Sequence, residues 1–302
     1  MPPVRTGRYR ARRVSLAEVP AVAGVAHRHV SVNGVRLHVA EAGHGPPLIL
    51  LHCWPQHWWC WRHLIPRLAR DYRVLAPDLR GWGWSDAPRD DYAKATFAAD
   101  ILALMDAEEL GRVRLIGHDW GGYTCFLLAL EHPGRIERMV CLDIAPPWLG
   151  RARPRHLMTP LLGSYQALLA APLLGPRTMT SGNRFIRRVI RSGSGAAKRW
   201  SDDELDVYAR VLRDPARAGA TAACYRTFLT RELPGIALGG QGSEDLEVPT
   251  LLVMGEASPL RRVLDPEPSR NLRVEQLANA GHFLPEEAPA EVLELALGHL
   301  TG

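Results

Sequence analysis

The stretch Gly117-His118-Asp119-Trp120-Gly121-Gly122 decides the fold of this chain of 302 residues. It follows a run at 113–116 that predicts a strand, and it opens a run of small residues at 121–132 that predicts a helix. Glycines two positions to either side of Asp119 permit the tight, strained turn from strand to helix that is called a nucleophile elbow. We therefore expect Asp119 to stand at the tip of such a turn, at one edge of a sheet.

The residue at the tip of this turn decides the chemistry that the chain can support. Such turns usually carry a serine, whereas this one carries Asp119. A carboxylate that attacks a carbon of an epoxide or an alkyl halide forms an alkyl ester, which water can cleave at its carbonyl. The structural alternative is a carboxylate that caps the following helix. The flanking glycines favour covalent catalysis through an alkyl-enzyme and argue against a lipase or a peptidase.

Strands and helices alternate along most of the chain. Two alternating runs flank Asn33-Gly34, a pair typical of a tight hairpin. Strands are predicted at 29–32, 36–42, 48–51, 72–77, 113–116, 136–144, 250–254 and 273–277, and helices at 62–70, 96–110, 121–132 and 291–300. This alternation predicts a mostly parallel, eight-stranded α/β sheet with helices on both faces.

The alternation stops between 146 and 235, where helical patterns follow one another. Ser201 and Glu204 form a capping-box pattern at the start of one of them, and a glycine-rich return linker is expected at 239–242. The predicted helices of this insertion are 165–170, 183–191, 202–212 and 216–232. We divide the chain into a basic N-terminal tail (1–27), a first core segment (28–145), a helical cap (146–235) and a second core segment (236–302).

The composition is that of an ordinary globular protein, with 46% hydrophobic and 23% charged residues. No apolar run reaches the roughly 18 residues that a membrane span requires. The formal net charge of +5 equals the five arginines of residues 1–13, a segment without acidic residues. The basic balance therefore gives no reason to expect nucleic acid as a partner, and no membrane partner is expected either.

The five cysteines contain no CxxC pair, which argues against a disulfide framework and a metal site and favours a reducing, cytoplasmic location. A dinucleotide-binding GxGxxG motif is absent from the sequence, and we expect no cofactor. The oligomeric state stays open, with a homodimer as one alternative.

A second chemically active residue is His282, which follows the last predicted strand in the segment Ala280-Gly281-His282-Phe283-Leu284-Pro285. With an ordinary pKa of about 6.5, an imidazole can take a proton from water near neutral pH. A single histidine is more often structural. Its place after the final strand, later in the chain than the elbow, favours a general base.

Four motifs, in this order, resemble those of the α/β-hydrolase superfamily, specifically its epoxide hydrolase and haloalkane dehalogenase branch. They are His52-Cys53-Trp54-Pro55, which is similar to a His-Gly-X-Pro loop, Asp78-Leu79-Arg80-Gly81-Trp82-Gly83-Trp84-Ser85, the Asp119 turn, and Gly281-His282-Phe283. The resemblance covers roughly residues 28–300 and implies the α/β-hydrolase fold, whose cap domain corresponds to 146–235.

The resemblance implies a role for each matching residue. It identifies Asp119 as the nucleophile, His282 as the general base, and the backbone N–H groups of Trp54 and Trp120 as an oxyanion hole. The residues that it places at the substrate are His52, Pro55 and Trp120.

The loop at 52–55 also departs from the family pattern. The resemblance implies a cis peptide bond between Trp54 and Pro55, a conformation that is only mildly disfavoured before proline. Cys53 replaces the family's glycine and adds a thiol where the backbone lies close to substrate.

The acid that pairs with the base is less plainly marked. Many relatives place an aspartate where this chain has Ser258, which cannot balance an imidazolium. Asp143, at the end of the adjacent strand, resembles the acid of several dehalogenases and some epoxide hydrolases. Neighbouring strands lie about 4.8 Å apart, so either strand end can reach the imidazole. We predict Asp143, with Glu256 and Asp265 as poorer candidates and a structural strand-end residue as the alternative.

Two tyrosines of the predicted cap, Tyr165 and Tyr225, resemble the pair with which epoxide hydrolases protonate the epoxide oxygen, and Tyr208 is a spare candidate. A phenol has an ordinary pKa of about 10 and so keeps its proton until an alkoxide develops. For each tyrosine alone, packing of an amphipathic helix is the alternative.

The leading hypothesis is an epoxide hydrolase that converts a hydrophobic epoxide and water to a vicinal diol. A haloalkane dehalogenase is the alternative, because the indole of Trp120 can hold a leaving halide, although that branch usually has asparagine at the position of Trp54. A fluoroacetate-type dehalogenase would need an arginine beside the nucleophile. A third hypothesis is a catalytically impaired binding protein, against which the presence of both nucleophile and base argues.

Overall fold

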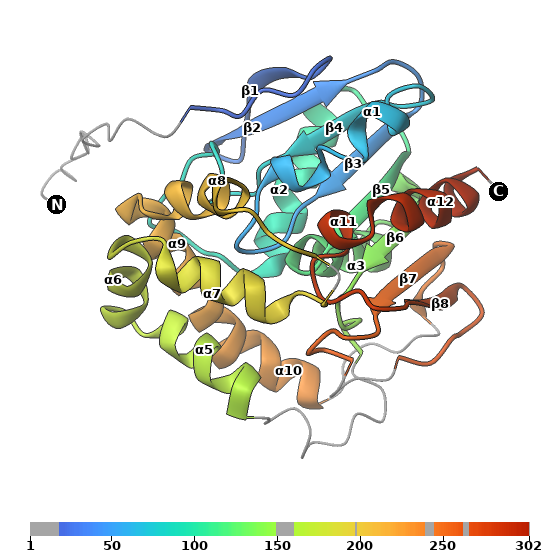
Figure 1. The fold of residues 1–302 in the computed structure, drawn as a ribbon. Coiled ribbons are helices and arrows are strands. Elements are labelled where there is room, and N and C mark those ends of the chain that lie inside the picture. Colours follow the sequence, from blue (N-terminus) through green and yellow to red (C-terminus); the bar gives the residue numbers. More distant parts are fainter. Residues whose placement is uncertain (1–17, 149–159, 197, 239–244, 262–265, 302) are drawn as a thin grey trace, which may run out of the picture.

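Eight strands form one sheet in a computed structural model that describes residues 18–148, 160–196, 198–238, 245–261 and 266–301 (Figure 1). The strands are β1 (Ala26–Val32), β2 (Val35–Ala42), β3 (Pro47–Leu51), β4 (Arg73–Pro77), β5 (Val113–His118), β6 (Ile136–Leu142), β7 (Thr250–Gly255) and β8 (Leu272–Leu277). Their order is β1-β2-β4-β3-β5-β6-β7-β8. The six strands from β4 to β8 in that order are parallel, and β2 pairs antiparallel with β1 and β4. The predicted fold class is confirmed.

The hairpin that opens the sheet follows from its turn residues. Asn33 and Gly34 have φ values of 45° and 77°, and Val32 pairs directly with Val35. Two consecutive residues with positive φ are what a two-residue turn needs to match the right-handed twist of the strands.

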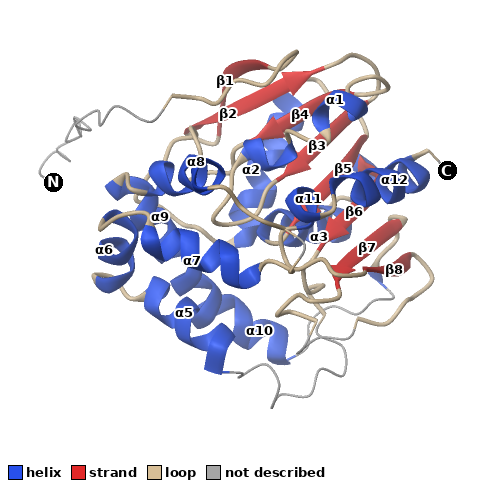
Figure 2. Ribbon diagram, viewed as in Figure 1, coloured by secondary structure: helices blue, strands red, loops and turns tan. Residues whose placement is uncertain are grey.

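Helices cover both faces of the sheet. Figure 2 shows α12 in front of the strands and α2 and α3 behind them. The core helices are α1 (Ile65–Leu68), α2 (Lys94–Ala107), α3 (Trp120–Glu131), α11 (Leu284–Glu287) and α12 (Pro289–Leu300), with 3₁₀ turns η1 (Trp58–Trp61) and η2 (Pro133–Arg135). The helix predicted at 62–70 was too long, because Pro66 is tolerated only in the first turn of a helix and α1 begins one residue before it.

A group of helices between β6 and β7 gathers at one end of the sheet (Figure 1). They are α5 (Pro160–Ala170), α6 (Leu174–Thr180), α7 (Arg184–Gly193), α8 (Asp202–Leu212), α9 (Pro215–Thr227), the π-helix η3 (Phe228–Glu232) and α10 (Leu233–Leu238). The capping box of Ser201 and Glu204 is present at the start of α8. We call this group the cap. Its last helix runs past the predicted boundary at 235, and the expected linker at 239–242 lies outside the described residues.

The interior is apolar and holds no disulfide among the described residues. Every residue of β7 is buried, as are four of the five in β3. All five cysteines are buried and free. Among the described residues, no helix combines the length and the apolar character that crossing a membrane demands.

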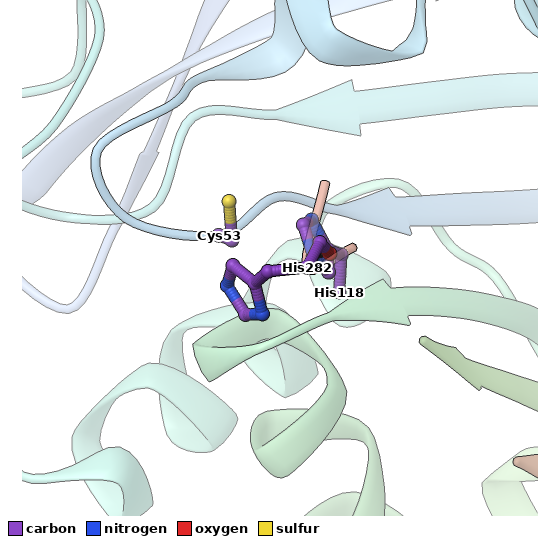
Figure 3. Close-up of side chains that lie close together, drawn as sticks. All are labelled: Cys53, His118 and His282. Atoms are coloured by element: carbon purple, nitrogen blue, oxygen red, sulfur yellow. Dashed lines mark hydrogen bonds between the residues drawn. The ribbon is translucent and has the colours of Figure 1, made fainter. Parts of the chain in front are cut away.

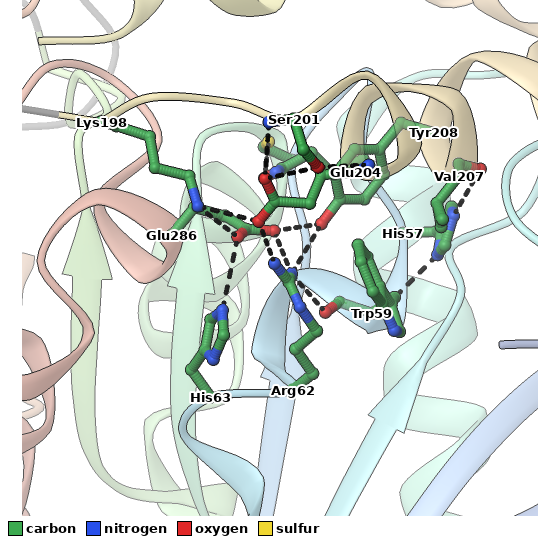
Figure 4. A network of polar contacts seen from close by, with 12 residues as sticks. His57, Trp59, Arg62, His63, Lys198, Ser201, Glu204, Val207, Tyr208 and Glu286 are labelled. Carbon is green, nitrogen blue, oxygen red and sulfur yellow. Dashed lines mark hydrogen bonds and ion pairs between the residues drawn. The ribbon is translucent and has the colours of Figure 1, made fainter. Parts of the chain in front are cut away.

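A buried polar network joins the cap to the core (Figure 4). Arg62, which follows η1, donates to Glu286 of α11 at 2.5 Å and to Glu204 of α8 at 3.0 Å. The hydroxyl of Tyr208, also on α8, donates to Glu286. The side chain of Glu286 has no exposed surface, and that of Arg62 is 10% exposed. Removing the cation therefore leaves a carboxylate in the interior with fewer donors.

We predict that Arg62→Met lowers the free energy of unfolding by about 3 kcal/mol, because an ion left without its partner in the interior is costly. The matched control is Arg36→Met. The ion pair of Arg36 with Asp86 is largely exposed, so this substitution should lower the free energy of unfolding by about 1 kcal/mol or less. Urea denaturation followed by circular dichroism measures both. Equal losses in the two variants would contradict a role for the network in holding the cap.

Candidate active site

The carboxyl ends of five parallel strands meet at the edge of the sheet that faces the cap. The segments that follow β3, β5, β6, β7 and β8 carry, respectively, the loop 52–55, Asp119, Asp143, Ser258 and His282. Parallel strands bring such ends together whatever their separation in sequence, which is why ligands of open α/β sheets bind there.

Asp119 stands at a strained turn between β5 and α3, with φ 49° and ψ −118°. A Cβ atom on Gly121 would lie 2.1 Å from the carbonyl oxygen of Leu51, so only glycine lets the first turn of α3 pack against the end of β3. The side chain of Asp119 makes no capping hydrogen bond to the described part of α3. The carboxylate of Asp119 therefore does not act as the N-cap of α3.

Burial raises the pKa of Asp119 to about 6. The charge of His282 and the backbone N–H groups of Trp120 and Trp54 act in the opposite direction and favour the carboxylate. The two amides that face the carboxyl group come from the two residues predicted to form the oxyanion hole. A carboxylate with little hydration and two amide donors is an available nucleophile at neutral pH.

His282 and Asp143 form a tight pair, in which Nδ1 of the imidazole donates to Oδ2 of the carboxylate at 2.6 Å. Asp143 is fully buried, has φ 43°, and also accepts from the backbone N–H of Gly255 at 3.1 Å. Burial alone would lower the pKa of His282, but the hydrogen bond and the charge of Asp143 raise it above its ordinary value. The carboxylate therefore stabilises the imidazolium that forms when His282 takes up a proton.

Ser258 supports this pair, since its hydroxyl donates to Oδ2 of Asp143 at 2.6 Å. The position where many relatives have an acid thus holds a donor to the acid on the next strand. Glu256 is exposed and accepts from the backbone N–H of Asn279 at 3.2 Å. Asp265 lies outside the described residues. Of the three acid candidates, the described structure brings Asp143 to the imidazole.

Hydrogen bonds of His52 to the backbone hold the loop after β3 in place. The Trp54–Pro55 peptide bond is cis, as the resemblance implied. His52 uses both ring nitrogens on the backbone, with Nδ1 donating to the Cys53 carbonyl and Nε2 accepting from Leu79 N–H, each at 2.9 Å. His52 thus positions the loop and offers no free ring nitrogen to a substrate, while Pro55 is buried beside it.

Four aromatic rings lie together above Asp119. The ring centroids of Tyr165 and Tyr225 are 6.2 Å apart, and Tyr225 lies 5.3 Å from Trp54 and 5.9 Å from Trp120. Burial raises the pKa of Tyr165 to about 12 and that of Tyr225 well above its ordinary value, and the charge of Asp119 raises both further. Both phenols therefore stay protonated beside the carboxylate. Tyr208 is not among them, because its hydroxyl is bonded to Glu286.

Two buried residues close to this group were given no role in the sequence analysis. His118 is fully buried, and its Nε2 donates to the carbonyl of His282 at 2.7 Å. Lys94 is also buried, with its ammonium 2.7 Å from Glu232 and 4.4 Å from the centre of a Trp120 ring. His118 precedes the nucleophile in the deciding stretch, a signal that was available, whereas nothing near Lys94 in sequence marks it.

Comparison with known proteins agrees with the fold. A family model described as alpha/beta hydrolase fold matches residues 46–289. A soluble epoxide hydrolase of Corynebacterium sp. (strain C12) is 30% identical over 282 residues, 90% of this chain and 96% of that protein. Epoxide hydrolase 4 of Homo sapiens is 29% identical over 91% of this chain and 78% of its own length. The solved structure of the epoxide hydrolase CorEH without ligand superposes with a TM-score of 0.80 at 29% identity, over 92% of this chain and 99% of that one.

We predict that Asp143→Asn lowers the pKa of His282 from above to below its ordinary value of about 6.5, because the burial remains while the negative charge is lost. NMR titration of the imidazole in labelled protein measures it. Ser258→Ala is the control. It removes a donor from Asp143 and should leave the pKa of His282 unchanged or higher. A pKa that stays above 6.5 in Asp143→Asn would contradict the pairing.

Proposed function

The chain belongs to the α/β-hydrolase family and is a hydrolase, and from that premise we propose that it is an epoxide hydrolase acting on a hydrophobic epoxide. The observation that carries the proposal is a carboxylate at the tip of the turn, Asp119, which faces the two phenols Tyr165 and Tyr225. The indoles of Trp54 and Trp120 beside them form apolar walls and so favour an apolar substrate.

In the first step, the carboxylate of Asp119 attacks a ring carbon of the epoxide. A carbon–oxygen bond to the enzyme forms, the ring bond breaks, and its electron pair passes to the epoxide oxygen. Tyr225 or Tyr165 donates a proton to that oxygen as the charge develops, which avoids a free alkoxide in a site with little water. The product of this step is an alkyl ester on Asp119.

In the second step, His282 takes a proton from water, and the hydroxide attacks the carbonyl carbon of the ester. The amides of Trp54 and Trp120 stabilise the oxyanion, and Asp143 stabilises the imidazolium. When the ester bond breaks, the imidazolium returns a proton to the oxygen of the departing diol. The regenerated carboxyl group of Asp119 then loses its proton, and the tyrosinate left by the first step takes up a proton, so that the enzyme returns to its starting state. One oxygen of the diol therefore comes from the carboxylate of Asp119. The oxygen of the attacking water stays on Asp119 and becomes part of the regenerated carboxylate.

A haloalkane dehalogenase remains the second candidate for one reason. The indole Nε1 of Trp120 is buried beside the phenol of Tyr225, where it can donate to a leaving halide. A halide leaves without a proton, however, and such a reaction would not use the two phenols. Their position over Asp119 favours the epoxide.

We predict that His282→Gln accumulates the alkyl ester, because alkylation continues while no base activates water. Intact-protein mass spectrometry after mixing with an aryl epoxide should show one adduct, and digestion should place it on the peptide with Asp119. The variant Asp119→Asn/His282→Gln is the control without adduct. In a single turnover in heavy-oxygen water, the wild-type enzyme should take the label into Asp119. A label found in the product alone would exclude the ester.

A second prediction separates the two candidate functions. Tyr225→Phe should slow epoxide opening by on the order of 10²–10⁴-fold, because it removes a positioned acid. The rate with a bromoalkane should change far less. Tyr208→Phe is the matched control, a buried cap tyrosine that points to Glu286, and rapid-mix kinetics measures all the rates. Unchanged epoxide opening in both Tyr225→Phe and Tyr165→Phe would remove the reason for preferring the epoxide.

A further inference from the structure

Two loops and the end of a strand bring a thiol and two imidazoles together (Figure 3). One ligand atom from each of Cys53, His118 and His282 lies within 4.8 Å of the other two. Cys53 and His118 are buried, and the side chain of His282 is 16% exposed. The ligands belong to the loop after β3, the end of β5 and the loop after β8, which is why cysteine spacing indicated no metal site.

Hydrogen bonds fix which nitrogen of each imidazole is free. Nδ1 of His282 donates to the carboxylate of Asp143 at 2.6 Å, which leaves a lone pair on Nε2. Nε2 of His118 donates to a backbone carbonyl at 2.7 Å, an acceptor that fixes the proton on that nitrogen. Its Nδ1 therefore carries a lone pair, and this buried atom has no hydrogen-bond partner among the described residues. A buried acceptor without a partner is costly, so the position favours a ligand.

This is also how proteins hold metal-ligating histidines. Such a histidine usually donates its second ring N–H to a carboxylate or a backbone carbonyl, and here one imidazole does each. The thiol of Cys53 is 3.1 Å from Oε1 of Gln56, which is its neighbour in the same loop. Two oriented lone pairs and one thiol are thus present in a site that is closed from most of the solvent.

We propose that Cys53, His118 and His282 bind a divalent cation that prefers sulfur and nitrogen, Zn²⁺ above others, and that this ion inhibits the enzyme. One thiolate and two imidazoles suit tetrahedral Zn²⁺, with water in the fourth position. The thiol proton passes to solvent when the ion binds. Mg²⁺ and Ca²⁺ prefer oxygen ligands and should not compete.

Inhibition follows from the lone pair that the ion occupies. Nε2 of His282 is the atom that accepts the proton of the hydrolytic water, and it cannot do so while it binds a cation. This half of the inference rests on the proposed function, whereas the binding of the ion does not. The thiol is the ligand that distinguishes this chain from the family pattern, which has glycine there.

The first arm of the test is a Zn²⁺ titration of chelator-treated enzyme, with epoxide hydrolysis compared to each protein's own metal-free rate. Wild type and the control Cys141→Ala, which changes a buried thiol of β6 outside the cluster, should be inhibited at the same concentration. Cys53→Gly should need at least about 10–100-fold more Zn²⁺. Mg²⁺ at the same concentrations should have no effect. Equal inhibition of Cys53→Gly and wild type would overturn the site.

The second arm needs no activity. Co²⁺ should give wild type and Cys141→Ala a thiolate-to-metal charge-transfer band with one ion per chain, and Cys53→Gly should lack it. Cys53→Ser gives the same comparison if the glycine variant does not fold. Absence of the band in wild type would overturn the site. A wild-type band in a protein that hydrolyses no epoxide would support the site and contradict the proposed function instead.

Discussion

A carboxylate without exposed surface, Asp143, accepts hydrogen bonds from Nδ1 of His282, from the hydroxyl of Ser258 and from the backbone N–H of Gly255. Gly255 is the last residue of β7, Ser258 follows β7, and His282 follows β8. One buried charge at the end of β6 therefore connects the ends of three neighbouring strands. A buried charge must be paired to persist, and the imidazolium is its partner. The orientation of the imidazole, and with it the position of its second ring nitrogen, depends on this carboxylate.

Burial acts on the other groups of the site in different directions. It raises the pKa of Asp119 and keeps the phenols of Tyr165 and Tyr225 protonated, since each of these groups is neutral in its acidic form. For His118 burial lowers the pKa, because its acidic form is the charged one. In the proposed mechanism, burial thus prepares a nucleophile, two acids and a neutral imidazole by one physical cause.

Residues of the cap contact the core loops that carry the site. Thr221 of α9 accepts from the indoles of Trp54 at 3.2 Å and Trp82 at 3.1 Å, two residues of the core loops. Phe228 of the π-helix packs against Trp120 with 4.8 Å between ring centroids. Together with the network around Glu286, these contacts hold the cap against the core loops. The substrate site is therefore shared between two parts of the chain that lie about a hundred residues apart.

Local patterns in the sequence determined the alternating strands, the Asn33-Gly34 hairpin and the strained turn at Asp119, because turn geometry and burial act over a few neighbouring residues. What the tertiary structure decided are the relations between strand ends. One such relation is the hydrogen bond from Ser258 to Asp143, which joins residues more than 100 positions apart. Another is the approach of Cys53, His118 and His282, which belong to three separate segments of the chain. Strand order sets these distances, and strand order results from packing of the whole sheet, which no local pattern encodes.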